Sequence, residues 1–122
     1  MPKRRVLIVD DEPGFTRLAK LNLEQTGRYE VCEVHRGAQA LEAARAFHPD
    51  VVVLDMVMPD LDGGEVAARL PAAHGGRAMP VVFVSAMLKP KGVSHPFLSK
   101  PVSIEALVAS IEQACAQQRR GR

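Results

Sequence analysis

The chain of 122 residues has no tryptophan, one tyrosine and only two cysteines. Cys32 and Cys115 lie too far apart to form a local metal or redox motif, so each is expected to be a small buried residue in a reducing compartment. The histidines are scattered and lack the spacing of metal ligands; they are His35, His48, His74 and His95. The sequence therefore argues against a disulfide framework and a histidine-bound metal.

Long hydrophobic runs are also missing, and the N-terminus has no signal-peptide pattern, so we expect a cytoplasmic protein that does not contact a membrane. The formal net charge of +2 is too small to predict nucleic-acid binding by this domain. Much of the excess lies near the two ends, where solvated flanks are expected: Lys3, Arg4, Arg5, Arg119, Arg120 and Arg122.

What the sequence does contain is a globular composition, with 47% hydrophobic and 25% charged residues. Its length suits one domain, which we place at residues 1–118, followed by a basic tail at 119–122. Apolar runs predict strands at residues 6–10, 29–34, 51–55, 81–86 and, briefly, 97–98. Helices are predicted at residues 13–26, 38–47, 64–70 and from Ser103 onward. This alternation predicts a doubly wound α/β fold with a parallel sheet.

Polar residues follow the predicted strands at the same end. The stretch VVVLDMVMPDLDGG, residues 51–64, passes from a strand that is apolar on both faces directly to Asp55. Corresponding positions after the other strands carry Asp10, Asp11 and Glu12, then Ser85, then Lys100. Ligands of open α/β sheets bind at the carboxyl ends of the strands. If the strand order is 2-1-3-4-5, these side chains converge on one crevice.

Clustered carboxylates repel one another unless positive charge intervenes. Lys100 supplies one charge, and an all-oxygen site completed by water suits Mg²⁺. A carboxylate, Mg²⁺, a hydroxyl and a lysine are the groups that phosphoryl transfer to an aspartate needs. Each residue has an ordinary structural explanation by itself, because strand-end aspartates often form caps or turns. The joint arrangement is much more specific.

The segments VLIVDDEP, VVVLDMVMPDLDGGE, VVFVSA and FLSKP occur in this order over essentially the whole chain. With them the sequence resembles the receiver domain of two-component response regulators, including chemotaxis-regulator-like members. The resemblance implies a flavodoxin-like, five-stranded parallel sheet in the order 2-1-3-4-5. It also implies a Mg²⁺-dependent phosphoacceptor that is switched by phosphorylation.

Carried over position by position, the resemblance assigns Asp55 as the phosphoacceptor. Asp11 matches the direct Mg²⁺ ligand, Asp10 matches the ligand that acts through water, and Val57 matches the position whose backbone carbonyl binds the metal. The remaining matches are the hydroxyl residue, the lysine that contacts the phosphoryl group and the switch aromatic: Ser85, Lys100 and Phe97. An ordinary core phenylalanine would look the same as Phe97.

One segment departs from the family pattern. Only residues 86–99 separate Ser85 from Lys100, where the family usually has enough additional residues for a full fourth helix. Pro90 and Pro96 oppose a continuing helix. We therefore expect a fourth helix that is shortened to one turn or absent, and an altered output or dimer face.

The predicted function is a signalling module and not an enzyme. A phosphohistidine on a sensor histidine kinase or phosphotransfer protein would donate to Asp55, and the switched surface would bind a downstream protein target that the sequence does not name. The chain is either a single-domain regulator or a receiver from a longer protein.

Three competing functions are compatible with parts of the same pattern. A small phosphatase could use an aspartate nucleophile, although Val57 stands where such enzymes carry a second acid. A receiver that is no longer phosphorylated could serve only as a docking surface. A flavodoxin-like cofactor binder is disfavoured by the acids after the first strand, because they would repel a phosphate without metal.

Overall fold

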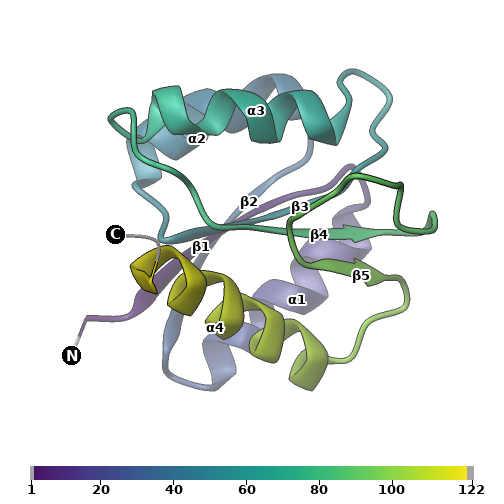
Figure 1. Cartoon of the computed structure of the whole chain (residues 1–122). Helices are drawn as coiled ribbons and strands as arrows, with labels where there is room; N and C mark the ends of the chain where they lie inside the picture. The colour runs from purple at the N-terminus through teal and green to yellow at the C-terminus, as the bar shows by residue number, and fades with distance from the viewer. Residues whose placement is uncertain (1, 121–122) are drawn as a thin grey trace.

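A computed structural model describes residues 2–120, with side chains described through residue 117. Five parallel strands form one sheet in the order β2-β1-β3-β4-β5, as the sequence predicts (Figure 1). The strands are β1 (Arg4–Val9), β2 (Tyr29–Val34), β3 (Val51–Leu54), β4 (Val81–Ser85) and β5 (Phe97–Ser99).

Helices cover both faces of the sheet (Figure 1). One face carries α1 (Pro13–Gln25) and α4 (Ile104–Arg120). The other carries α2 (Ala40–Phe47), preceded by the 3-10 turn η1 (Gly37–Gln39), and α3 (Gly63–Ala73). None of the described helices is long and apolar enough to cross a membrane.

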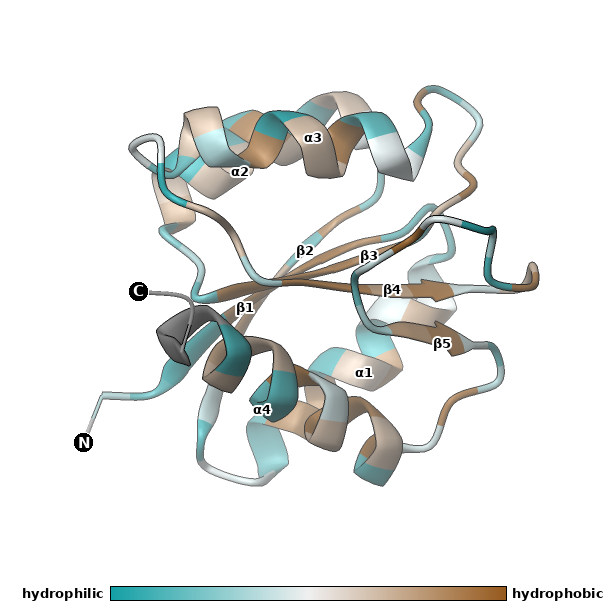
Figure 2. Cartoon of the chain, in the orientation of Figure 1, coloured by the Kyte–Doolittle hydropathy of each residue, from teal (hydrophilic) through white to brown (hydrophobic). Residues whose placement is uncertain are grey.

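Two hydrophobic cores explain why β1, β3 and β4 are apolar on both faces. Successive strand side chains point to opposite sides, so Val6 and Ile8 of β1 pack toward α1 and α4, whereas Leu7 and Val9 pack toward α2 and α3. Figure 2 shows the resulting hydrophobic layer in the middle of the molecule. Because helices cover both faces of these central strands, polar side chains are expected at the strand ends, where they can reach solvent or a ligand.

The absence of a helix between β4 and β5 is confirmed. Residues 86–96, all of which are described, form bends and one turn (Figure 1). Pro90 and Pro96 interrupt helical hydrogen bonding, and Gly92 adopts a left-handed φ of 84°. The face of β4 and β5 nearest α3 is therefore covered by a loop instead of a helix.

Three sequence expectations need correction. The predicted helix at residues 64–70 begins at Gly63 and continues through Pro71 to Ala73, because this proline costs only one hydrogen bond near the end of the helix. The Pro71 carbonyl then accepts hydrogen bonds from the His74 and Gly76 N–H groups, at 3.0 and 2.8 Å.

The basic N-terminal segment is a solvated flank only at Lys3, because Arg4 and Arg5 are half-buried. Arg4 pairs with Glu112 at 3.2 Å, and Arg5 pairs with Glu30 at 3.0 Å. At the other end, α4 extends through Arg120, two residues into the predicted tail. Gly121 and Arg122 lie outside the described residues, and the domain boundary at residue 118 stays a prediction.

Candidate functional site

Three aspartates meet at the carboxyl edge of the sheet. Asp10 and Asp11 follow β1, and Asp55 follows the neighbouring strand β3. Each can offer an oxygen such that the three oxygens lie within 4.8 Å of one another. Asp10 and Asp55 are buried, at 1% and 6% exposure, whereas Asp11 is exposed. The expected convergence of these carboxylates is therefore present.

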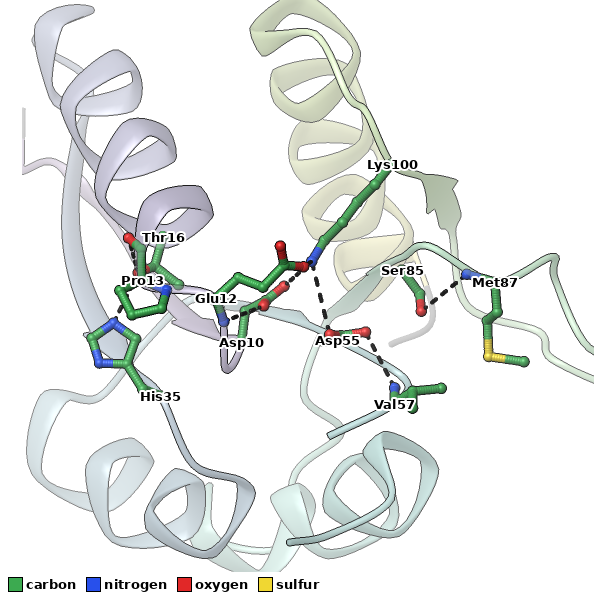
Figure 3. A network of polar contacts seen from close by, with 10 residues as sticks. All are labelled: Asp10, Glu12, Pro13, Thr16, His35, Asp55, Val57, Ser85, Met87 and Lys100. Carbon is green, nitrogen blue, oxygen red and sulfur yellow. Dashed lines mark hydrogen bonds and ion pairs between the residues drawn. The ribbon is translucent and has the colours of Figure 1, made fainter. Parts of the chain in front are cut away.

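Lys100 reaches this cluster from the end of β5 (Figure 3). Its Nζ lies 2.8 Å from Asp10 Oδ2, 2.6 Å from Glu12 Oε1 and 3.8 Å from Asp55 Oδ2. The Lys100 N–H also donates to the Ser85 carbonyl at 2.8 Å, which fixes the backbone beside β4. In this structure the ammonium therefore contacts Asp10 and Glu12 more closely than Asp55.

The electrostatics of the cluster follow from burial. Burial raises the pKa of Asp10 above its ordinary value, although the contact with Lys100 and the Glu12 N–H partly offset this effect. Burial opposes the charge on Lys100, but its contacts with Asp10 and Glu12 outweigh that penalty and raise the pKa of Lys100. Among the described residues, four carboxyl groups therefore share one ammonium at this edge: those of Asp10, Asp11, Glu12 and Asp55.

The donor set fits a hard divalent cation. Asp10 Oδ2 is buried and accepts no well-aligned hydrogen bond from the described residues, although Lys100 lies close enough for an ion pair. All three candidate ligands offer carboxylate oxygen, which is the donor that Mg²⁺ prefers. A cation would add a second positive partner to Asp10 Oδ2 beside Lys100 and reduce the repulsion among the carboxylates.

The loop after β3 fixes the position of Asp55. The Asp55 N–H donates to the Val9 carbonyl at 2.9 Å, and the Val57 N–H donates to Asp55 Oδ1 at 3.2 Å. Farther on, the Gly63 N–H donates to the Met56 carbonyl at 2.9 Å. A Cβ on Gly63 would collide with the Asp55 carbonyl oxygen, so only glycine allows this close approach.

Ser85 ends β4 at 1% exposure, and its Oγ lies 3.5 Å from the Met87 N–H (Figure 3). A cavity of about 490 Å³ opens between the strand ends, and its lining brings together most of the predicted residues, Asp10 and Phe97 excepted. These include Asp11, Asp55, Val57, Ser85 and Lys100. The arrangement can hold a cation and accept a phosphoryl-sized anion between Asp55, Ser85 and Lys100.

Phe97 lies apart from this cavity lining. Its ring is partly buried among the apolar side chains beneath α3, with its centroid 6.3 Å from that of Phe83. This position is that of a core phenylalanine, and the switch role of Phe97 stays a prediction.

Sequence reasoning placed Glu12 at this edge but gave it no partner, and it missed two further contributors. Glu12 contacts Lys100. Asp60 accepts hydrogen bonds from the Gly37 and Ala38 N–H groups, at 3.2 and 3.1 Å. Gly63 allows the loop to approach Asp55. Asp62, the residue before it, caps α3 by accepting from the Gly64 N–H at 2.6 Å.

Comparisons with known proteins point in one direction. A family model described as the response regulator receiver domain matches residues 6–112. The transcriptional regulatory protein TrcR of Mycobacterium tuberculosis is 36% identical over 114 residues, covering 88% of this chain and 43% of TrcR. The polar-differentiation response regulator DivK of Brucella ovis is 29% identical over 116 residues, covering 89% of this chain and 94% of DivK.

Solved structures agree. The receiver domain of the putative response regulator NarL from Mycobacterium tuberculosis superposes with a TM-score of 0.81 at 31% identity, covering 94% of this chain and 98% of that domain. A CheY-like receiver domain protein from Methanospirillum hungatei superposes with a TM-score of 0.84, covering 99% of this chain and 100% of that protein. Its sequence identity is 22%, so this likeness supports the fold alone. The chain spans half or less of the length of the first curated relatives, including 43% of TrcR and 50% of the regulator KdpE.

Proposed function

The chain belongs to the receiver domain family of response regulators, as its sequence predicts, and we propose that Asp55 is its phosphoacceptor. Receiver domains are signalling modules and generally bind Mg²⁺ at an acidic cluster. The observation that carries the proposal is the cluster of three aspartates beside Lys100, of which Asp11, Asp55 and Lys100 line one cavity. The donor would be a phosphohistidine on a sensor histidine kinase or a phosphotransfer protein, and we place donor and target in the cytoplasm.

In the proposed reaction an Asp55 carboxylate oxygen attacks phosphorus, and the bond between phosphorus and the donor histidine nitrogen breaks. Asp11, Asp10, Asp55 and the Val57 carbonyl would hold Mg²⁺. When bound, Mg²⁺ supplies positive charge that offsets charge on the phosphoryl oxygens. The Asp55 carboxylate needs no activating base, because it is the nucleophile in its ionised form.

Lys100 and Ser85 would bind the transferred group. The Lys100 ammonium has to exchange its contact with Glu12 for one with a phosphoryl oxygen. Because its Nζ already lies 3.8 Å from Asp55 Oδ2, the side chain would have to move only a short distance. The Ser85 hydroxyl, now only weakly engaged with the Met87 N–H, would donate to another oxygen. We propose that this rearrangement, with Phe97 following Ser85, switches a protein-interaction surface.

The test is Mg²⁺-dependent labelling of the chain by acetyl phosphate. We expect wild type to gain one phosphoryl group by intact mass, and Asp55→Asn to gain none. The matched control is Glu65→Gln, which removes an exposed carboxylate on α3 and should leave labelling unchanged. Equal labelling of Asp55→Asn, or no labelling of wild type, would refute the assignment. Steady turnover of p-nitrophenyl phosphate would instead support a phosphatase.

A further inference from the structure

A second, larger cavity lies beside the candidate phosphorylation site. It has a volume of about 540 Å³ and runs between α3 and the loop that joins β4 to β5. Ala67 and Ala68 line it from α3, Phe83 forms part of its floor, and Val93 lines it from the loop. We call this cavity the α3 groove. Its lining is mainly apolar.

The groove exists because β4 and β5 lack a covering helix. The loop at residues 86–96 passes over this part of the sheet but does not fill the space beside α3. Val93 and Phe97 are consequently only partly buried against the core below. A helix laid along the groove would complete the helical layer that α2 and α3 begin (Figures 1 and 2).

The shape of the groove favours a helix over a small molecule. Small-molecule sites enclose roughly 70–90% of the ligand surface. Here several lining residues stay open to solvent, including Val57 at 59% exposure, Met87 at 37% and Ala68 on α3. An open apolar groove instead suits the apolar face of an amphipathic helix.

The charge of the rim selects the kind of helix. Lys89 and Lys91 are exposed on the loop, on either side of Pro90, which lines the groove. On the opposite side, the charges of Glu65 and Arg69 offset each other in an ion pair of 3.8 Å, and Asp62, which lines the groove, adds one negative charge at the start of α3. The loop side therefore attracts negative charge. A second copy of the chain presenting α1 would be repelled, because Arg17 and Lys20 accompany the exposed leucines of that helix.

We propose that the α3 groove binds an acidic amphipathic helix of a partner protein, and that phosphorylation of Asp55 changes its affinity. The coupling arises because Val57 and Met87 line both the groove and the phosphoacceptor cavity. Movement of Ser85 toward a phosphoryl group would displace Met87, which follows it by two residues. The effect of phosphorylation on helix binding rests on the proposed function. Binding of the helix to the unphosphorylated chain does not depend on it.

The probe is a synthetic amphipathic helix with leucines at i, i+3, i+4 and i+7 and glutamates beside them; its control replaces the glutamates with lysines. Binding to the isotope-labelled full chain is followed by NMR. We expect the acidic peptide to shift the amides of Ala68 and Val93, and the lysine peptide to shift neither. The double variant Lys89→Glu/Lys91→Glu should weaken binding about tenfold, whereas Lys20→Glu on α1 should not.

Ala68→Lys separates occupancy of the groove from general charge attraction. Its side chain blocks the groove yet adds positive charge, so weaker binding supports docking and stronger binding refutes it. Binding that survives both groove variants, an absence of shifts at saturating peptide, or a dimer of the chain that buries these residues would each overturn the proposal. Equal affinity before and after acetyl phosphate treatment would overturn the coupling. Labelling of Asp55 is measured on the same samples, so failure of the proposed function is seen separately.

Discussion

The two edges of the sheet carry charged residues in different ways. At the amino edge, cations and acids are matched: Arg4 pairs with Glu112, Arg5 pairs with Glu30, and Glu112 also accepts a hydrogen bond from Tyr29 at 2.6 Å. At the carboxyl edge, Lys100 is the one lysine that the described residues place beside four carboxylates. These are Asp10, Asp11, Glu12 and Asp55. The amino edge is arranged for stability. The carboxyl edge retains unbalanced charge, which a cation and a phosphoryl group could use.

Gly63→Ala should have the largest effect and should disrupt the carboxyl edge. The added methyl would overlap the Asp55 carbonyl oxygen and crowd Met56 Cα, both backbone atoms that cannot move independently. We expect a loss of about 3 kcal/mol or more in the free energy of unfolding, measured by urea denaturation, together with loss of labelling. The matched control is Gly14→Ala on α1, where a Cβ would meet nothing within 4 Å. Equal stability of the two variants would contradict the close approach.

Adding Mg²⁺ should distinguish the two edges directly. Binding to the native carboxylate cluster would raise the free energy of unfolding by about 2.7 kcal/mol when the ion is at 100 times its dissociation constant. Asp11→Asn should remove most of this gain, and because Asp11 is exposed the metal-free fold should tolerate the change. Glu30→Gln at the amino edge should leave the gain intact. Thermal unfolding with and without the ion provides the measurement, and an equal gain in Asp11→Asn would remove Asp11 from the site.

The sequence predicted the carboxyl edge well because its signals are local. A strand that is apolar on both faces has to lie inside a covered parallel sheet, and the residue that follows it then lies at the sheet edge. Asp55 and Ser85 could be placed in this way from their own segments. The missing helix between β4 and β5 was also local information, since Pro90 and Pro96 oppose it in any context.

Apart from the Asp62 cap and the close approach of Gly63 to Asp55, the contacts that sequence reasoning missed join distant parts of the chain. The contact of Glu12 with Lys100 joins residues 88 positions apart. The contact of Asp60 with the Gly37 N–H depends on how two loops meet in space. The pairing of Arg4 with Glu112 likewise requires α4 to pass beside β1. No pattern within one segment specifies such partners.

At the amino edge, Tyr29→Phe should cost about 1 kcal/mol, because a buried hydroxyl loses its hydrogen bond to Glu112. Burial and that hydrogen bond raise the pKa of Tyr29 from 10.0 to about 12. A raised pKa stabilises the fold below the unfolded value of 10.0, and this contribution disappears as the pH rises through 12. The stability difference between wild type and variant should therefore shrink over that range. Labelling by acetyl phosphate should be unchanged, and its loss would contradict the division between the edges.

The smallest effects should come from Asp10→Asn and Asp60→Asn, and they should have opposite signs. The pKa of Asp10 is raised, chiefly by burial, so its ionisation costs stability as the pH rises from the unfolded value through the folded one. The pKa of Asp60 is lowered, chiefly by the Ala38 N–H, so its ionisation adds stability that is lost as the pH falls.

In metal-free buffer near neutral pH, Asp10→Asn should thus unfold at higher urea concentration than wild type, and Asp60→Asn at lower concentration. Both differences should fade in acid, where the aspartates of wild type are protonated. A loss of stability in Asp10→Asn at neutral pH would mean that the contact with Lys100 outweighs burial. The carboxyl edge would then be balanced without a metal ion, as the amino edge is.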